Sequence, residues 1–64
     1  MYYIKIKTLD DYEIKINLDY VVNVIIIDNS ITFSFSSEQQ DCTFVEGEDV
    51  ENVKAIYDLI PFHS

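Results

Sequence analysis

Arginine and tryptophan are absent from the sequence, and cysteine, glycine and proline each occur once among its 64 residues. A single cysteine excludes an internal disulfide, which argues against an oxidising compartment. A single glycine excludes the glycine-rich loops that bind phosphate groups. Membrane-spanning helices are excluded too, since no run approaches the roughly 18 consecutive apolar residues that they need. We therefore expect one small, soluble, cytoplasmic domain over residues 1–64, with no membrane partner.

Positive charge is scarce, because four lysines face twelve acidic residues and the formal net charge is −8. Direct binding to nucleic acid needs cations that neutralise phosphate, so nucleic acid is excluded as a direct partner. Net charge of this size also keeps a small protein in solution without any further role. The alternative hypothesis is an acidic surface that binds a basic protein. The uneven distribution favours it, because after residue 37 a single lysine, Lys54, accompanies Glu38, Asp41, Glu46, Glu48, Asp49, Glu51 and Asp58.

No arrangement of residues points to catalysis or to a metal. Cys42 and His63 are the one pair that resembles a nucleophile and a base, but they are far apart in the sequence, and Cys42 alternates with Phe44 as a buried thiol would. The sequence lacks the paired cysteines and histidines of zinc sites. Its acidic clusters lack the alternating oxygen ligands of calcium loops, and turns or helix starts account for them. We therefore expect a protein that is not an enzyme and has no catalytic residue, cofactor or metal.

Five stretches have the residue pattern of β-strands. The first two place isoleucines at alternate positions on either side of a turn at Asp10-Asp11, which is typical of a hairpin. The third is short, rich in β-branched residues and bounded by turn residues, so a strand is favoured over a buried helix. The expected strands are residues 2–8, 12–18, 20–27, 31–37 and 42–46.

The hydrophobic period changes after the single glycine. Apolar residues then recur at helical spacing from Val50 to Ile60, and Pro61 disfavours helical geometry at the residue before it. A helix is expected over residues 49–60, with Asp49 or the preceding glutamate as its N-terminal cap. The predicted fold class is α+β: a five-stranded antiparallel meander, as a curled sheet or a small partly open barrel, followed by one C-terminal helix.

The third predicted strand is apolar on both of its faces. Val21, Ile25 and Ile27 share one face, and one short helix is too small to cover both sides of the sheet. Either the sheet curls shut over these residues or a second chain covers them. Of the two we expect a homodimer, in which Val21, Ile25 and Ile27 take part through a sheet face or a sheet edge. The register with the fourth strand stays open, since a three-residue loop aligns Ile25 with Phe33, whereas a four-residue loop aligns Ile26 with Phe33.

Two acidic segments flank the fifth predicted strand. We expect the polar loop before this strand and the helix start after it to lie together and to face a basic groove of another protein, where they compete with nucleic acid. The alternative is a solvated surface with no partner. Tyr3 points away from the isoleucine face of its strand and is expected to contact a partner as well. The expected partner-binding residues are Glu38, Asp41, Glu46, Glu48, Asp49, Glu51 and Tyr3.

Four segments follow the order of parts in a known bacterial family: Ile4-Lys5-Ile6-Lys7-Thr8-Leu9, Asn17-Leu18-Asp19, Ile31-Thr32-Phe33, and Val45 to Val53. They resemble the hairpin, the Asn-x-Asp corner, the strand and the acidic helix lead of the small FlbD/SwrD-type flagellar and swarming-motility proteins, over residues 3–60. Asp10-Asp11 and Ser37–Asp41 stand where that family usually has glycine-bearing turns. The resemblance implies the same topology, an adapter role in bacterial motility and no catalytic residues.

Size and charge also resemble those of phage-encoded anti-defence proteins, including anti-CRISPR-like mimics of DNA. On this hypothesis the chain is an inhibitor that occupies the basic, nucleic-acid-binding surface of a host protein such as a nuclease. The alternatives are a motility adapter, and a small-ligand or nucleotide-sequestering protein. The last needs cationic donors, for which Lys5, Lys7 and Lys15 of a dimer are the candidates. Genomic neighbours distinguish the first two hypotheses, and nucleotide-induced thermal shifts test the third.

Overall fold

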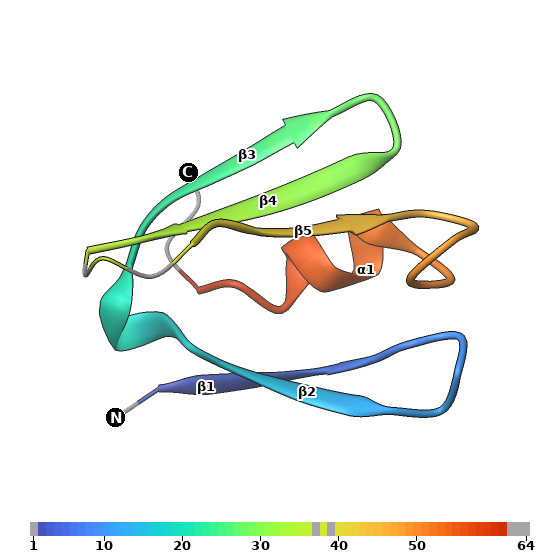
Figure 1. Ribbon diagram of the computed structural model, residues 1–64, viewed down its shortest axis with the longest axis horizontal. Helices are drawn as coiled ribbons and strands as arrows, with labels where there is room; N and C mark the ends of the chain where they lie inside the picture. Colours follow the sequence, from blue (N-terminus) through green and yellow to red (C-terminus); the bar gives the residue numbers. More distant parts are fainter. Residues whose placement is uncertain (1, 37, 39, 62–64) are drawn as a thin grey trace.

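A computed structural model describes residues 2–36, 38 and 40–61 of the chain (Figure 1). The protein has an α+β structure with two antiparallel sheets and one short C-terminal helix. In chain order the elements are β1 (Tyr3–Lys7), β2 (Glu13–Asn17), the 3-10 helix η1 (Leu18–Tyr20), β3 (Val21–Ile27), β4 (Ser30–Phe35), β5 (Cys42–Val45) and α1 (Val53–Asp58).

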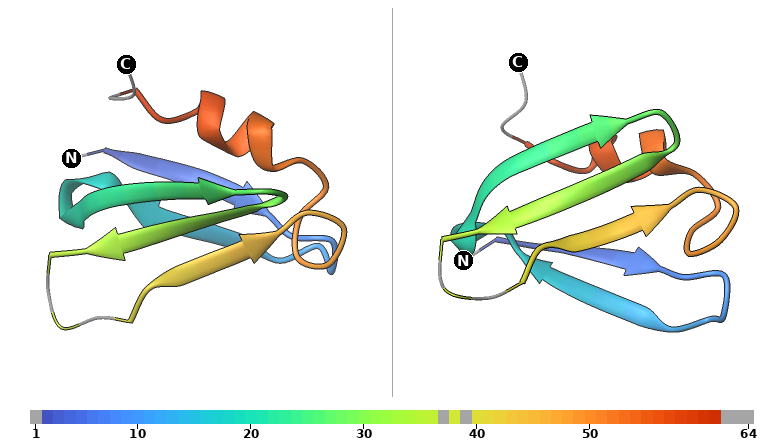
Figure 2. Two further views of the ribbon diagram at one scale, coloured as in Figure 1. Left: turned by 90° about the horizontal axis from the view of Figure 1, so that it is seen from above. Right: turned by 45° about the horizontal axis from the view of Figure 1, so that its top comes forward.

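The five strands of the described chain form two separate sheets, not the single meander that the sequence predicts. β1 and β2 form a two-stranded sheet, whereas β3, β4 and β5 form a second sheet in that order. The chain turns sharply between them, because Asn17 Oδ1 accepts a hydrogen bond from the Asp19 amide (3.0 Å) and the Val21 amide donates to the Leu18 carbonyl. The turn redirects the chain before β3, so one curled sheet or partly open barrel is not confirmed (Figure 2).

One apolar core lies between the two sheets and the helix. Phe33 and Ile31 of β4 are fully buried, and the Phe33 ring meets Phe44 edge-on, with 6.2 Å between centroids and 76° between planes. In the left view of Figure 2, α1 lies to one side of both sheets. The buried residues are Ile4, Ile6, Ile16, Leu18, Ile31, Phe33, Phe44, Val50, Val53, Ile56 and Ile60. None of them belongs to β3, which therefore lies at the margin of the core.

The turn between β3 and β4 consists of residues 28–29 and is shorter than either loop expected from the sequence. Ile26 therefore lies opposite Ile31, and Val24 lies opposite Phe33. Both predicted registers are wrong, because the three-residue and four-residue loops would have shifted this pairing along the strand. The observed register places Val24 and Ile26 on the same face as the buried side chains of β4.

β3 is irregular near its start, and its exposed residues differ from the predicted set. The register shifts between Val21 and Asn23, which marks a bulge. Val21 and Val24 are half-buried against the core, whereas Ile25 and Ile27 are exposed. Of the three residues predicted to mediate self-association, Ile25 and Ile27 share an exposed face, but Val21 packs on the core side beyond the bulge.

α1 begins at Val53, later than the predicted start at residue 49. Its cap is Asn52, whose Oδ1 accepts a hydrogen bond from the Ala55 amide (3.1 Å). Val50 and Ile60 are buried although neither is helical. The apolar spacing therefore predicted which side chains enter the core, but not where the helix starts or which residue caps it.

Several strand ends also differ from the prediction. β1 and β2 each begin one residue later and end one residue earlier than expected, so Tyr2 and Tyr12 lie outside these strands, and both side chains are exposed. β4 ends at Phe35, and the predicted extension of this strand reaches residue 37, which lies outside the described residues.

Candidate functional site

Three connections meet at one end of the molecule, after β1, β3 and β5 (Figure 1). The last of them, residues 46–52, is hydrogen-bonded to both of the others. The Leu9 amide in the β1–β2 turn donates to the Asp49 carbonyl (2.9 Å). The Glu46 amide donates to the Asn29 carbonyl in the β3–β4 turn (2.8 Å), and Asn29 Nδ2 donates to the Glu46 carbonyl (3.3 Å). These bonds join three turns that are distant in the sequence into one surface.

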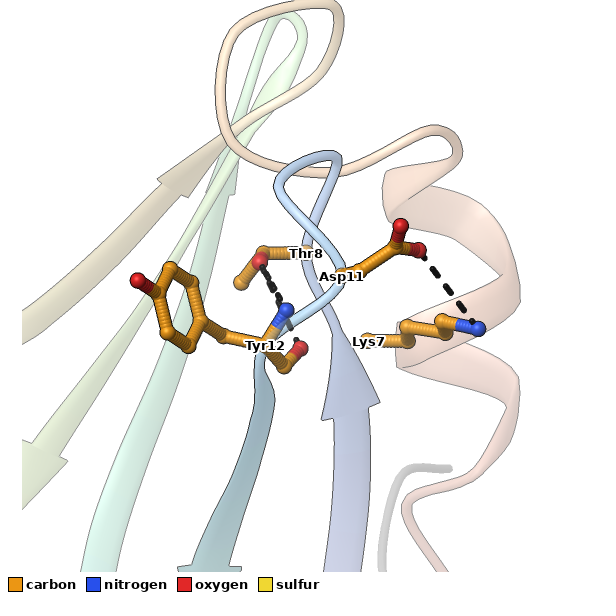
Figure 3. A network of polar contacts seen from close by, with 4 residues as sticks. All are labelled: Lys7, Thr8, Asp11 and Tyr12. Atoms are coloured by element: carbon orange, nitrogen blue, oxygen red, sulfur yellow. Dashed lines mark hydrogen bonds and ion pairs between the residues drawn. The ribbon is translucent and has the colours of Figure 1, made fainter.

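Each of these connections contains a residue with a left-handed backbone: Asp11 has φ 67°, Asp28 has φ 52° and Gly47 has φ 89°. Glycine adopts this conformation because it has no Cβ, and aspartate tolerates it because its short polar side chain bonds the local backbone. In the β1–β2 turn, Thr8 Oγ1 accepts from the Tyr12 amide (3.1 Å; Figure 3), and the Thr8 amide donates to the Tyr12 carbonyl (2.8 Å). Turn geometry therefore accounts for two of the aspartates at this end.

Most of the twelve acidic residues of the chain lie in or next to these three connections, and we call this region the acidic end. The acids of the third connection were predicted from the sequence to bind a partner, whereas those of the first two were not. The strand order could have identified the acids of the first two connections, because in an antiparallel arrangement the connections after odd-numbered strands lie at one end. The acids at the acidic end are Asp10, Asp11, Glu13, Asp28, Glu46, Glu48, Asp49 and Glu51.

A hollow of about 400 Å³ opens at the acidic end between β2 and β5. Asp10, Glu13 and Asp49 line it from three different segments, together with Tyr12, whose side chain is 71% exposed. The described residues around it include no lysine. We call this the acidic hollow, and its other lining residues are Thr8, Ile14, Thr43 and Phe44.

Two acids that were predicted to bind a partner also hold the acidic end together. Asp49 Oδ2 accepts a hydrogen bond from the Val45 amide at the end of β5 (2.9 Å). Glu46 Oε1 accepts from the amide of Val53, the first residue of α1 (3.0 Å). A carboxylate in this position satisfies one of the amides that have no partner inside the helix. This segment therefore contributes both charge and local structure.

Lys5 and Lys7 lie on β1, at the edge of the β1–β2 hairpin beside α1, and Lys7 is the cross-strand partner of Glu13. Lys7 Nζ is 3.7 Å from Asp11 Oδ1 (Figure 3), and this exposed ion pair contributes little stability. A second hollow of about 430 Å³ is lined by Lys5 and Lys7 together with Glu51. The Glu51 carboxylate disfavours the anionic phosphate that a nucleotide-sequestering protein would bind there. Lys15 is the cross-strand partner of Lys5, so these three lysines do lie on one hairpin.

Glu38, Asp41 and Tyr3 lie away from the acidic end. Glu38 and Asp41 belong to the connection between β4 and β5, at the opposite end of the sheet (Figure 1). Tyr3 begins β1 and lines a groove of about 530 Å³ with Tyr20 and Cys42. The single negative surface predicted on both flanks of β5 is therefore not formed, because this strand separates its two halves.

Among residues 2–36, 38 and 40–61, no group of three or more histidine, cysteine, aspartate or glutamate side chains is placed to hold a metal ion. Cys42 is a half-buried thiol in the groove beside Tyr3, and His63 lies outside the described residues. None of the helices in these ranges has both the length and the hydropathy that a bilayer crossing requires.

No protein-family model matches the chain, and no curated protein or solved structure matches it significantly. The resemblances to FlbD/SwrD-type motility proteins and to phage anti-defence proteins therefore remain predictions.

Proposed function

We propose that this protein is a non-enzymatic interaction module whose acidic end occupies a basic surface of another protein. The acidic hollow carries the proposal, because Asp10, Glu13, Asp49 and the exposed ring of Tyr12 line one cavity of about 400 Å³. Carboxylates bind guanidinium and ammonium groups through charge-assisted hydrogen bonds. The ligand that fits this lining is an arginine or lysine side chain of the partner.

Arginine fits the acidic hollow better than lysine does. Its planar guanidinium can bond carboxylates through two parallel hydrogen bonds and can stack on an aromatic ring. Tyr12 supplies the ring, while Asp10 in the turn and Glu13 at the start of β2 supply acceptors. Ile14 and Phe44 add apolar surface for the methylene stem of the side chain. The volume lies at the lower end of the roughly 300–1,000 Å³ of ligand pockets, which suits one long side chain.

Hydrogen bonds hold the acidic hollow in place before a partner arrives. Thr8 and Tyr12 are joined by backbone and side-chain bonds across the β1–β2 turn. Asp49 is held by the Leu9 amide at its carbonyl and by the Val45 amide at its carboxylate. A preorganised site loses less conformational entropy on binding than a flexible one, which supports a specific contact rather than a diffuse attraction.

An inhibitor of a nucleic-acid-binding protein is the concrete form of the proposal. Grooves that bind nucleic acid present arginine and lysine side chains to the phosphate backbone. The acids of three hydrogen-bonded turns offer negative charges in place of those phosphates, and the net charge of −8 steers the protein towards such a groove. In this form the protein competes with nucleic acid on a host nuclease, as the phage anti-defence hypothesis expects.

Two pairs of neutral substitutions test whether the acidic hollow is the binding site. Asp10→Asn with Glu13→Gln removes two charges from the hollow, and Glu38→Gln with Asp58→Asn removes the same charge elsewhere. A fluorescent oligoarginine peptide serves as the probe, and its anisotropy is measured at several salt concentrations. We expect the first double variant to bind about tenfold more weakly than the second, or ~1.4 kcal/mol.

Equal weakening in the two double variants would mean that net charge alone governs binding, which contradicts the assignment of the acidic hollow. Affinity of the unmodified protein should also fall steeply between about 50 and 300 mM salt, because the contact is electrostatic. An affinity that does not depend on salt would contradict the mechanism.

A further inference from the structure

β3 forms an open edge of the three-stranded sheet. Among the described strands, β4 is its neighbour on one side and no strand pairs with the other side. Val22 is 65% exposed, Ile27 is 63% exposed and Ile25 is 39% exposed. An edge strand directs alternate N–H and C=O groups away from its neighbour, where water or another strand must pair with them. Exposed apolar side chains and outward backbone groups therefore occur together along β3.

The edges of the other strands are protected against pairing. β1 and β2 carry charged side chains such as Lys5 and Lys15. β5 is four residues long, and the amide of its last residue, Val45, is bonded to the Asp49 carboxylate. Charged side chains and short strands are devices by which proteins prevent edge-to-edge pairing. β3 is seven residues long and contains neither a charged residue nor a proline.

We propose that a second copy of this chain adds to the edge of β3 in antiparallel orientation, so that two three-stranded sheets join into one of six strands. A strand that pairs antiparallel with its own copy makes an isologous contact, which closes at two chains. The bulge at the start of β3 leaves residues 23–27 as its regular part. Symmetric pairing over this part puts Ile25 at the two-fold axis and Val24 of one chain opposite Ile26 of the other. The proposal is independent of the partner of the acidic end.

The negative charge of the chain explains both why a second copy pairs at β3 and why the two β3 strands are antiparallel. Each copy has a net charge of −8, and β3 is a stretch of surface where two copies meet without setting acids against acids. The acidic end lies directly beyond the C-terminal end of β3 (Figure 1). Antiparallel pairing places the two acidic ends at opposite ends of the joined sheet, whereas parallel pairing would place them side by side. Repulsion between like charges therefore favours the antiparallel arrangement.

The inner side of β3 has room for an added strand. A hollow of about 300 Å³ beside Ile26 is lined by Val53, Lys54 and Tyr57 of α1 and by the polar residues Asp28, Asn29 and Glu46. The proposed register sets Val24 of the second copy next to this hollow, near Ile26. On the other face Ile25 meets its own copy, and cross-strand pairs of β-branched residues contribute to pairing.

Sedimentation velocity on the full chain, from about 5 to 500 µM, tests the proposal, because a single-strand contact is small and a Kd on the order of 1–100 µM is expected. Ile25→Lys blocks the edge, while Leu59→Lys adds the same charge at an exposed apolar position just after α1. Each lysine lowers the repulsion between copies, so charge alone cannot explain a loss of dimer. We expect the unmodified protein and Leu59→Lys to dimerise and Ile25→Lys to stay monomeric, with circular dichroism verifying its fold.

Cross-linking tests the orientation without relying on the lysine variants. In a Cys42→Ser background, Ile25→Cys should form a covalent dimer on mild oxidation, because antiparallel partners at the axis have the Cα separation that a disulfide needs. Asn23→Cys should not, because the proposed register sets it opposite Ile27 of the second copy. Cross-linking through Asn23→Cys would show parallel pairing. That result would overturn the proposal. Sedimentation would overturn it too if the unmodified protein stays monomeric at every concentration, if Ile25→Lys still dimerises, or if the assemblies grow beyond two chains.

Discussion

Asp49 has two roles at the acidic end, because its side chain both lines the acidic hollow and anchors the end of β5. The Val45 amide donates to Asp49 Oδ2, and the Leu9 amide donates to the Asp49 carbonyl, both over 2.9 Å. Glu48, the preceding residue, is exposed and carries the same charge. Comparing substitutions at Asp49 and Glu48 therefore separates what the Asp49 hydrogen bond contributes to stability from what its negative charge contributes.

Asp49→Ala is expected to lower the free energy of unfolding by about 1–2 kcal/mol, because it leaves the Val45 amide without its acceptor. Glu48→Ala is expected to change it by less than about 0.5 kcal/mol. Both substitutions relieve the same repulsion within the acidic end, so their difference isolates the hydrogen bond. Urea denaturation followed by circular dichroism measures it. Equal stabilities would show that the Asp49–Val45 bond contributes nothing.

Gly47 has φ 89°, and a Cβ added there would meet nothing within 4 Å. The cost of a side chain at this position is therefore a backbone cost alone. Gly47→Ala is expected to lower stability by about 1 kcal/mol, and Gly47→Asn by less, because asparagine enters the left-handed region more readily. Thermal denaturation should rank the three proteins in the order glycine, asparagine, alanine. An alanine variant as stable as the parent would contradict the left-handed turn.

At the level of elements, alternation along the chain was sufficient to predict the β1–β2 hairpin. The β3–β4 register could not be predicted, because it depends on the turn rather than on the strands. Ser30 resembles a turn residue in the sequence, yet it pairs with Ile27 as the first residue of β4, and its Oγ donates to the Ile27 carbonyl (2.9 Å). Asp28 makes this short turn possible with its φ of 52°.

The division of the strands into two sheets also could not be predicted from the sequence. Asn17-Leu18-Asp19 resembles the Asn-x-Asp corner of the motility family, and this segment is a corner in the structure, but its bonds are local. Whether β3 pairs with β2 in one sheet depends on contacts between residues that are distant in the sequence, including the burial of Leu18 in the shared core. The helix start shows the same limit, because Glu46 reaches the Val53 amide from across a loop.

At the scale of the whole molecule, the acidic residues gather at one end of the structure, and not in the C-terminal half of the sequence as their order along the chain suggests. The sequence analysis grouped Glu38 and Asp41 with the acids after β5, because they are close along the chain. The fold separates them by the length of β5 and brings Asp10 and Asp28 to the acidic end instead. The strand order alone, applied to the predicted strands, would have given this grouping.

The two proposed contacts are compatible in one assembly. Pairing through β3 leaves both acidic ends exposed and places them at opposite ends of the joined sheet. A dimer would then present two acidic hollows to its partners, and a partner with two basic sites would be held more tightly than a single contact allows.

Mapping the binding of the oligoarginine peptide by amide chemical shifts on ¹⁵N-labelled protein tests the central claim most directly, since it asks where a basic ligand binds. Binding at the acidic hollow predicts that the largest changes occur in residues 8–14, in residues 43–44 and at Asp49, and that they fade as salt is added. Changes centred on Glu38 and Asp41, or spread evenly over the acids of the chain, would contradict it.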